Sequence, residues 1–113
     1  MEILHLEEVD STNAYIMRNI GELEAPVMVS ANRQTAGQGQ RGNSWEAEPG
    51  KNLTLSVFYR PDGLPPMAQF SMSEAVALSV VDFLCSHGIE AKVKWPNDIY
   101  VGDRKICGIL IRH

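Results

Sequence analysis

The sequence is short of the features that mark several specialised classes of protein. It contains 2 cysteines, Cys85 and Cys107, and their separation matches neither a metal-binding spacing nor a disulfide framework. Basic residues are also in the minority, since the formal net charge is -4 at pH 7. A surface built to grip nucleic acid normally has a basic patch and a high isoelectric point. We therefore expect free buried thiols and no nucleic-acid partner.

Long apolar runs are missing as well. The longest one, around residues 75–84, is interrupted by Ser79 and Asp82, and a membrane span needs about 20 apolar residues. The first residues, Met1-Glu2-Ile3-Leu4-His5, lack the basic flank, apolar core and cleavage site of a secretory signal. We expect no membrane segment and a cytoplasmic location.

What is present is the composition of an ordinary globular protein. Hydrophobic residues make up 44% of the chain and charged residues 21%, which is unlike disordered or collagenous sequences. A length of 113 residues suits one hydrophobic core. We therefore expect a single domain spanning residues 1–113.

Hydrophobic periodicity predicts a mixture of helices and strands. Alternating or short buried runs indicate strands near residues 2–7, 27–31, 52–59, 92–95, 99–101 and 105–111, while residues 34–50 have a loop composition. Helical spacing indicates helices at 12–20 and 67–87. The second helix is expected to bury a stripe formed by Met72, Ala75, Val76, Ser79, Val80, Phe83 and Leu84. The fold class is α+β, with helices packed on a mixed, hairpin-rich and mostly antiparallel sheet.

A glycine-rich loop, Gly37-Gln38-Gly39-Gln40-Arg41-Gly42, is the first candidate site. Its G-x-G-x-x-G pattern is not a dinucleotide fingerprint, because it leads through Pro49-Gly50 into a strand rather than directly into a helix. Glycines still let backbone N–H groups approach a phosphate or carboxylate, and Arg41 supplies a fixed positive fork. The alternative interpretation is a flexible surface loop.

Two further segments combine turn-forming and functional residue types. Ser11-Thr12-Asn13 is suited to capping the first helix, a role that is compatible with ligand binding. Lys94-Trp95-Pro96-Asn97-Asp98 is an uncommon block that is followed by Lys105 and by Gly108. The proline fixes the backbone direction there, and the glycine permits close approach within a strand.

Together these blocks resemble the biotin protein ligases. The resemblance rests on Ser11-Thr12-Asn13 and on residues 34–45, 94–98 and 104–110, in that order, and it spans essentially the whole chain. It implies a biotin/lipoate ligase-like catalytic domain that is truncated at its C-terminus, without the DNA-binding domain and small C-terminal domain of some relatives. It also implies a two-step reaction. Biotin and ATP, with Mg²⁺, give biotinyl-5′-adenylate, and a lysine of a biotin carboxyl carrier protein then attacks the adenylate.

The resemblance further implies roles for individual residues. Hydroxyl and amide groups of Ser11, Thr12 and Gln34 would match the ureido ring of biotin, which has one carbonyl acceptor and two N–H donors. The catalytic residues would be Lys105, between the carboxylate and the α-phosphate, together with Asp98 and Arg41. The residues that would contact biotin or its adenylate are Ser11, Thr12, Asn13, Gln34, Gly37, Gln38, Gly39, Gln40, Gly42, Trp45, Asn97, Lys105 and Gly108.

Other interpretations remain open for three of these residues. Lys105 could also be a solvated lysine on the surface of a hairpin. Asp98 could also be a turn-forming residue that follows Asn97. Trp45 is the family's aromatic residue beside the ligand by resemblance, but it is equally suited to a core.

The chain departs from the family pattern at three positions. Gln38 and Gln40 stand where the family usually has arginine, and glutamine offers hydrogen bonds without charge. Arg112 stands where a glutamate is common. These changes put adenylate formation and retention in question.

Two alternatives to an active biotin ligase follow. One is a module that binds biotin or its adenylate without turnover, and the other is a lipoate ligase or octanoyl transferase of related fold. The Trp-Pro-Asn-Asp block favours biotin. No metal site of the chain's own is expected, and an incomplete sheet predicts self-association into a homo-oligomer.

Overall fold

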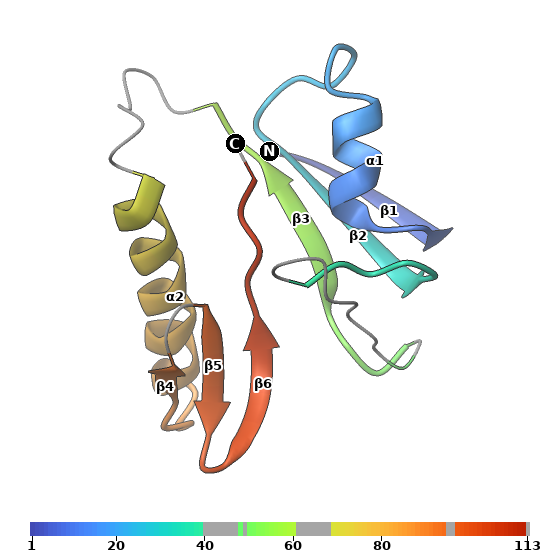
Figure 1. Cartoon of the computed structure of the whole chain (residues 1–113). Helices are drawn as coiled ribbons and strands as arrows, with labels where there is room; N and C mark the ends of the chain where they lie inside the picture. Colours follow the sequence, from blue (N-terminus) through green and yellow to red (C-terminus); the bar gives the residue numbers. More distant parts are fainter. Residues whose placement is uncertain (40–47, 49, 61–68, 95–96, 113) are drawn as a thin grey trace. The chain divides into compact units, whose positions relative to one another are not determined.

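The computed structural model describes residues 1–39, 48, 50–60, 69–94 and 97–112. It divides into two compact units, Met1–Asp62 and Gly63–His113, whose elements are labelled in Figure 1. Helices and sheets occur together, and three of the four described strand pairings are antiparallel. The α+β class with mostly antiparallel pairing is therefore confirmed, while the single domain stays a prediction.

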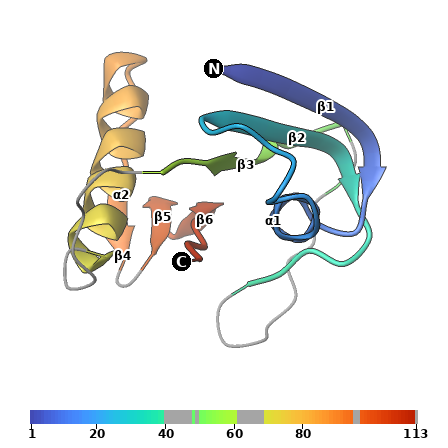
Figure 2. The same cartoon turned by 90° about the horizontal axis from the view of Figure 1, so that it is seen from above.

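The first unit contains a three-stranded sheet in the order β1-β2-β3. Its strands are β1 (Glu2–Val9), β2 (Val27–Gln34) and β3 (Thr54–Phe58). The first two are parallel and the last two antiparallel. Helix α1 (Thr12–Arg18) connects the parallel strands and lies against one face of the sheet, as Figure 2 shows along the helix axis. The chain thus forms a β-α-β crossover followed by an antiparallel edge strand.

Strand alternation decides which face of this sheet is buried. Val27, Val29 and Ala31 lie on one face of β2 and are buried with Ile16 of α1. Successive side chains of a strand point to opposite faces of the sheet. The residues of β1 and β3 that are register partners of these three residues therefore lie on the same covered face. The other face is open at Val57, which is 48% exposed. The core of the first unit therefore lies between α1 and the sheet.

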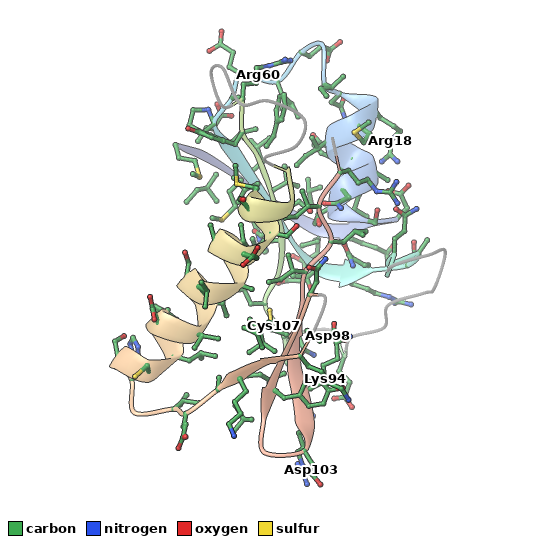
Figure 3. All side chains as sticks on the ribbon, turned by 60° about the vertical axis from the view of Figure 1, so that its left-hand side comes forward. Arg18, Arg60, Lys94, Asp98, Asp103 and Cys107 are labelled. Carbon is green, nitrogen blue, oxygen red and sulfur yellow. The ribbon has the colours of Figure 1, made fainter. Side chains whose placement is uncertain are left out.

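The second unit combines the long helix with a second sheet. Helix α2 (Gln69–Ser86) packs against β4 (Lys92–Lys94) and β5 (Asp98–Val101), and β6 (Arg104–Gly108) completes an antiparallel sheet. Gly102, with φ of 63°, forms the turn between β5 and β6, a backbone conformation that glycine adopts without steric cost. Asp103 lies at the tip of this hairpin in Figure 3.

The predicted apolar stripe of α2 is wrong in part. The most buried helix residue is Ala77, at 2% exposure, whereas Phe83 is 63% exposed, and Ala75 and Ser79 are also exposed. Nearly every position from residue 75 to 84 is apolar or small, so periodicity alone does not select one stripe. The small Ala77 side chain lies at the centre of the buried face, where a close helix–sheet approach is possible.

One strand boundary differs in a way that matters for the site. The loop was expected to begin at Gln34, but β2 continues through Gln34. The parallel neighbour β1 extends to Val9, which is the register partner of Gln34. Hydrogen bonding to β1 therefore keeps β2 in strand conformation as far as Gln34. None of the described helices is long and apolar enough to cross a membrane.

Candidate functional site

Two of the predicted binding segments meet where the parallel strands end. Val9 and Gln34 are partners in the last register position of β1 and β2. The pairing then continues into the following loops, because Thr35 N donates to Val9 O at 2.9 Å and Ala36 N to Asp10 O at 2.7 Å. In open sheets with parallel strands, ligands commonly bind beyond the carboxyl ends of the strands. The first candidate site lies at this edge.

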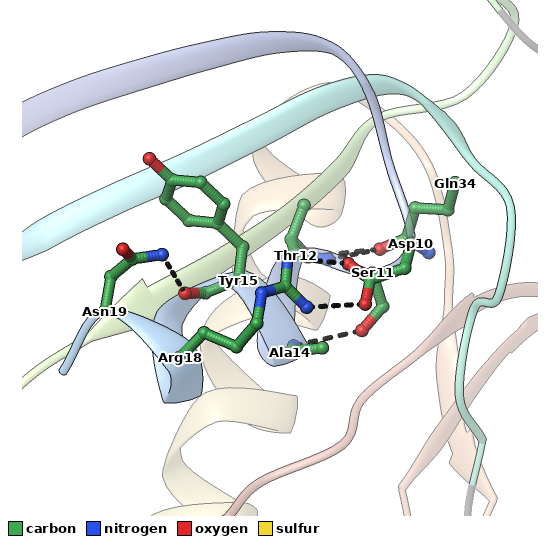
Figure 4. A network of polar contacts seen from close by, with 8 residues as sticks. All are labelled: Asp10, Ser11, Thr12, Ala14, Tyr15, Arg18, Asn19 and Gln34. Atoms are coloured by element: carbon green, nitrogen blue, oxygen red, sulfur yellow. Dashed lines mark hydrogen bonds and ion pairs between the residues drawn. The ribbon is translucent and has the colours of Figure 1, made fainter.

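The start of α1 is fixed by its cap and by an ion pair. Ser11 has extended backbone angles, and its Oγ accepts a hydrogen bond from Ala14 N at 3.0 Å. Arg18 holds Asp10 through two bonds, with Nη1 to Oδ2 at 2.5 Å and Nη2 to Oδ1 at 3.0 Å (Figure 4). The hydrogen bond from Arg18 holds the pKa of the Asp10 carboxyl below its usual value, and the same bond raises the pKa of Arg18.

At the far end of the helix, Asn19 Nδ2 donates to Tyr15 O at 2.8 Å. Tyr15 O also accepts from Asn19 N at 3.2 Å, so the side chain of Asn19 adds a second bond to a carbonyl of the last helical turn. Both ends of a seven-residue helix are thus secured, and this restrains Ser11, Thr12 and Asn13 at its first turn.

Thr12 is the centre of a polar network beneath this turn. Gln34 Oε1 accepts from Thr12 N at 2.8 Å and from Thr12 Oγ1 at 3.2 Å. Thr12 Oγ1 also lies 2.6 Å from Ser56 Oγ of β3, and Ser56 in turn donates to Asn13 Oδ1. Thr12 is 3% exposed and Ser11 2%. Buried side chains of this kind are normally hydrogen-bonded, and here the bonds join α1, β2 and β3.

Sequence reasoning missed Ser56. Its position in the alternation of residues 52–59 was visible, but periodicity does not say which face of an edge strand is buried. The structure places Ser56 opposite Val29 on the covered face, at 9% exposure. The only sign in the sequence was a serine within this alternating segment, at position 56. Its proximity to Thr12 follows from the register of β3 on β2, which the sequence does not show.

The glycine-rich loop is described as far as Gly39. Gly37 is buried, Gln38 is exposed and Gly39 is partly buried. Because Ala36 is tied to Asp10, the loop leaves β2 beside the capped start of α1. Four predicted site residues lie outside the described residues: Gln40, Arg41, Gly42 and Trp45.

The second unit brings Lys105 and Asp98 together. Lys105 Nζ lies 2.8 Å from Asp98 Oδ1, and each side chain is 33% exposed. They come from neighbouring strands, β6 and β5. An ion pair that is shielded in part from water is stronger than a fully solvated one.

A β-bulge makes this pair possible. The register passes from Cys107 opposite Ile99 to Lys105 opposite Tyr100, so Ile106 is the extra residue. In a regular ladder Lys105 would lie opposite Val101, on the other face from Asp98, because strand side chains alternate. The bulge turns Lys105 to the face of Asp98 and Tyr100, which is a common effect of an inserted strand residue.

Asn97 and Gly108 lie beside the ion pair along the chain. Gly108 is the register partner of Asp98, and Asn97 O accepts a hydrogen bond from Ile109 N at 3.1 Å. Burial raises the pKa of the neighbouring Cys107 thiol, Lys105 opposes this effect and Asp98 adds to it. The thiol is therefore held in its protonated form at neutral pH, where it is a poor nucleophile.

The predicted site residues thus fall into two groups, each internally organised. Ser11, Thr12, Asn13, Gln34 and the start of the glycine loop belong to the first unit. Asn97, Asp98, Lys105 and Gly108 belong to the second unit. Within the described part of the chain, no three His, Cys, Asp or Glu side chains cluster closely enough to hold a metal ion.

Comparison with known proteins provides an independent line of evidence. Residues 6–113 match the model of the biotin/lipoate A/B protein ligase family. The bifunctional ligase/repressor BirA of Escherichia coli is 40% identical over 107 residues, which are 94% of this chain and 33% of that protein. The biotin–[acetyl-CoA-carboxylase] ligase of Paracoccus denitrificans is 34% identical over 94% of this chain and 45% of its own length.

Solved structures agree with the sequence relatives. The biotin acetyl coenzyme A carboxylase synthetase of Helicobacter pylori with bound biotinylated ATP has a TM-score of 0.79 and 34% identity, over 99% of this chain and 55% of that one. Biotin protein ligase from Aquifex aeolicus in complex with biotin and ATP has a TM-score of 0.78 and 28% identity, over 96% of this chain and 45% of that one.

The chain spans between a third and about half of the length of these proteins. What it matches is accordingly part of their ligase domain. By sequence and by structure, the chain belongs to the biotin/lipoate A/B protein ligase family.

Proposed function

We propose that this chain forms the biotin-binding part of a biotin protein ligase. The observation that carries the proposal is the bonding of buried Thr12 to part-buried Gln34 beside the Ser11 cap, at the ends of two parallel strands. Two of the relatives' structures have biotin and ATP, or biotinylated ATP, bound. The proposed substrates are therefore biotin and ATP, with Mg²⁺ accompanying the nucleotide.

The hydrogen-bonding groups of the first unit suit a cyclic urea. Gln34 Oε1 is occupied by Thr12, so the Gln34 amide nitrogen keeps two hydrogens to donate. Ser11 Oγ accepts from Ala14 N, which uses a lone pair and leaves the Ser11 hydroxyl hydrogen for a ligand carbonyl. Such neutral groups match a urea, whose carbonyl accepts while its N–H groups donate, and they need no charge.

The Lys105–Asp98 pair suits the first chemical step. A carboxylate oxygen of biotin attacks the α-phosphorus of ATP, the bond to the bridging oxygen breaks, and pyrophosphate leaves with the electron pair. Two anionic groups must approach each other in this step. We assign Lys105 to the position between them, where a fixed cation stabilises charge that concentrates in the transition state.

The second step transfers the biotinyl group to a carrier protein. The carrier lysine attacks the adenylate carbonyl, an amide bond forms, and AMP leaves. The attacking amine must lose a proton, and we assign Asp98 to orient that amine or accept the proton. In the present structure Asp98 holds Lys105, so the same carboxylate would serve both steps. A biotin carboxyl carrier protein is the proposed partner, in the cytoplasm.

A titration with ligands tests the proposal. Isothermal titration of the chain with biotin, lipoate and octanoate, each with and without ATP, should give heat with biotin alone among the three acids. Pyrophosphate release in the presence of ATP then measures adenylate formation. Binding of lipoate or octanoate in place of biotin would assign the chain to the lipoyl branch of the family and contradict the proposal.

One observation favours a second function, a biotin-binding module without turnover. Gln38 is an exposed neutral residue in a loop where the resemblance leads us to expect arginine, and a neutral amide does not compensate phosphate charge. Biotin binding without pyrophosphate release would select this second function. Pyrophosphate release that depends on biotin would exclude it.

A further inference from the structure

We propose that Ser56 is a positioning residue that fixes Thr12 as a hydrogen-bond acceptor and thereby selects ligands with an N–H group. The inference rests on the proposed biotin site and deepens it. Ser56 belongs to β3, more than forty positions from the Ser11-Thr12-Asn13 segment. Its hydroxyl lies on the covered face of the sheet and contacts both Thr12 and Asn13.

Counting hydrogens gives the direction of each bond. Asn13 Oδ1 is a carbonyl oxygen that only accepts, so the single hydroxyl hydrogen of Ser56 is used in its bond to Asn13. The 2.6 Å contact between Thr12 Oγ1 and Ser56 Oγ also requires a hydrogen, which the Thr12 hydroxyl supplies while sharing it with the longer contact to Gln34 Oε1. Thr12 therefore donates to Ser56, and Ser56 donates to Asn13.

This direction determines what Thr12 presents to a ligand. Its hydrogen is engaged by Ser56, with a longer shared contact of 3.2 Å to Gln34 Oε1. The lone pairs of Thr12 Oγ1 remain, so the group acts as an acceptor. A ligand must then supply a donor, as the ureido N–H of biotin does. A dithiolane ring or an alkyl chain has no such donor and would leave a buried acceptor unsatisfied.

Burial preserves the directions of these hydrogen bonds. Ser56 is 9% exposed and Thr12 3% exposed, so water has little access to replace the Ser56 hydroxyl. Without Ser56 the Thr12 hydroxyl hydrogen keeps only its longer contact of 3.2 Å with Gln34 Oε1, so the direction of the hydroxyl is less firmly fixed and its lone pairs are less well oriented toward an incoming N–H. The loss of the positioning partner therefore affects recognition through Thr12 and not through a direct contact with the ligand.

The test compares Ser56→Ala with Ser30→Ala. Ser30 lies on the neighbouring strand β2 with its hydroxyl bonded to His5, and its register partner on β3 is Leu55, so it faces away from Thr12. In titrations of the full chain, Ser56→Ala should weaken biotin and dethiobiotin alike by about five- to thirty-fold, the loss expected for one hydrogen bond. Ser30→Ala should leave both dissociation constants unchanged.

A double-mutant cycle separates positioning from a general structural role. In a Thr12→Val background the acceptor is gone, so adding Ser56→Ala should change the biotin dissociation constant by less than about twofold. Ser56→Thr keeps the hydroxyl and should restore most of the affinity. Urea unfolding of each variant verifies that it is folded under the titration conditions.

The outcomes distinguish this inference from the proposed function. If the unmodified chain binds no biotin, the proposed site is wrong and the inference falls with it. If the unmodified chain and Ser56→Ala bind biotin equally, the site stands and the role of Ser56 is overturned. Equal losses from Ser56→Ala with and without Thr12 would also overturn it, because Ser56 would then act independently of Thr12.

Discussion

Thr12 shows how much of a binding site can be prepared by single side chains. Its backbone N–H and its hydroxyl both bond to Gln34 Oε1, which fixes the orientation of the amide without any ligand. A polar group held in this way loses little conformational freedom when it binds.

We predict that Thr12→Val and Gln34→Ala each weaken biotin binding by about 1–3 kcal/mol, the cost of leaving a buried polar partner unmatched. Calorimetry on each variant measures the loss. Thr12→Ser keeps the hydroxyl and serves as the control, with affinity close to that of the unmodified chain. Unchanged affinity in both test variants would contradict the assignment of the ureido-binding site to this edge of the sheet.

A second prediction at the residue scale concerns Lys105. In the protein at the full length of its relatives, Lys105→Ala should slow pyrophosphate release far more than it weakens biotin binding, because the lost cation acts on the converging anions. Lys105→Arg should recover only part of the rate, since a planar guanidinium does not replace a compact ammonium.

Lys92→Ala is the matched control for Lys105→Ala. Lys92 and Lys105 are both register partners of Tyr100 and belong to the same face of the β4-β5-β6 sheet, but only Lys105 is paired with Asp98. The control should leave pyrophosphate release unchanged. A Lys105→Ala variant that forms adenylate at the unmodified rate would show that another group supplies the cation.

Resemblance and local pattern predicted Thr12, Gln34, Asp98 and Lys105, and the structure brings these residues together in two pairs. They did not predict Ser56. The contact of Ser56 with Thr12 depends on the register between β2 and β3, which are separated in sequence by residues 35–53, and short-range sequence patterns contain no information on such a register.

At the scale of elements, helix α1 is a short segment that depends on its ends. A helix of seven residues is too short to be stable alone in water. The Ser11 cap, the Asp10–Arg18 pair and packing on the sheet together hold it. Because Thr12 and Asn13 lie in its first turn, helix stability and site geometry are linked.

We predict that Ser11→Ala destabilises the chain by about 1 kcal/mol and that Ser11→Gly costs only a few tenths of that amount, since glycine is tolerated at helix N-caps. Urea unfolding followed by circular dichroism measures both. Equal destabilisation by alanine and glycine would mean that the Ser11 hydroxyl acts through something other than the cap.

The Asp10–Arg18 pair predicts a dependence of stability on pH. The pKa of Asp10 is lowered in the folded chain, chiefly by its hydrogen bond with Arg18, so the carboxylate stabilises the fold above its unfolded pKa. This contribution is lost as the pH falls through the folded pKa. The free energy of unfolding of Asp10→Asn should therefore lie below that of the unmodified chain at pH 7 and converge with it in acid.

Urea titrations at a series of pH values, in parallel for both proteins, give the comparison. The Glu8–Arg33 ion pair is exposed on both sides, so Glu8→Gln is a suitable control and should show no such convergence. A constant gap between Asp10→Asn and the unmodified chain at all pH values would contradict the linkage.

Element types were predictable from the sequence, and some of their faces were not. Apolar periodicity identified both helices, yet in α2 it selected Ala75, Ser79 and Phe83 for the buried side, and all three are exposed. A helix that is apolar on most sides carries several equivalent stripes. The choice among them is made by tertiary packing on β4 and β5, which the sequence pattern does not encode.

For the whole molecule, the open face and edge of the first sheet are the most consequential feature. Within the described strands, β3 pairs with β2 on one side. Val57 of this strand is 48% exposed, and the residues that flank the strand, Leu53 and Tyr59, are 84% and 59% exposed. An edge strand with exposed apolar side chains is a site for pairing with another chain.

We therefore predict that this 113-residue chain self-associates at high concentration. Light scattering coupled to size-exclusion chromatography should show a mass that rises with concentration. Val57→Lys places a charge on the open face of the edge strand and should return the chain to a monomer, while Lys51→Glu, at an exposed position outside the strand, should not. A monomer at all concentrations would contradict the prediction.

The bulge at Ile106 has a consequence for how this part of the chain can vary. Lys105 lies on the face of Asp98 because the bulge leaves Ile106 outside the ladder, so that Lys105 is the register partner of Tyr100. The chemical character of Ile106, which is 47% exposed, therefore matters little for the ion pair. Substitutions at this position should be tolerated, and so should its deletion, because a regular ladder would then keep Cys107 opposite Ile99 and Lys105 opposite Tyr100. In this hairpin the register partner of the lysine is constrained, and the length of the strand is not.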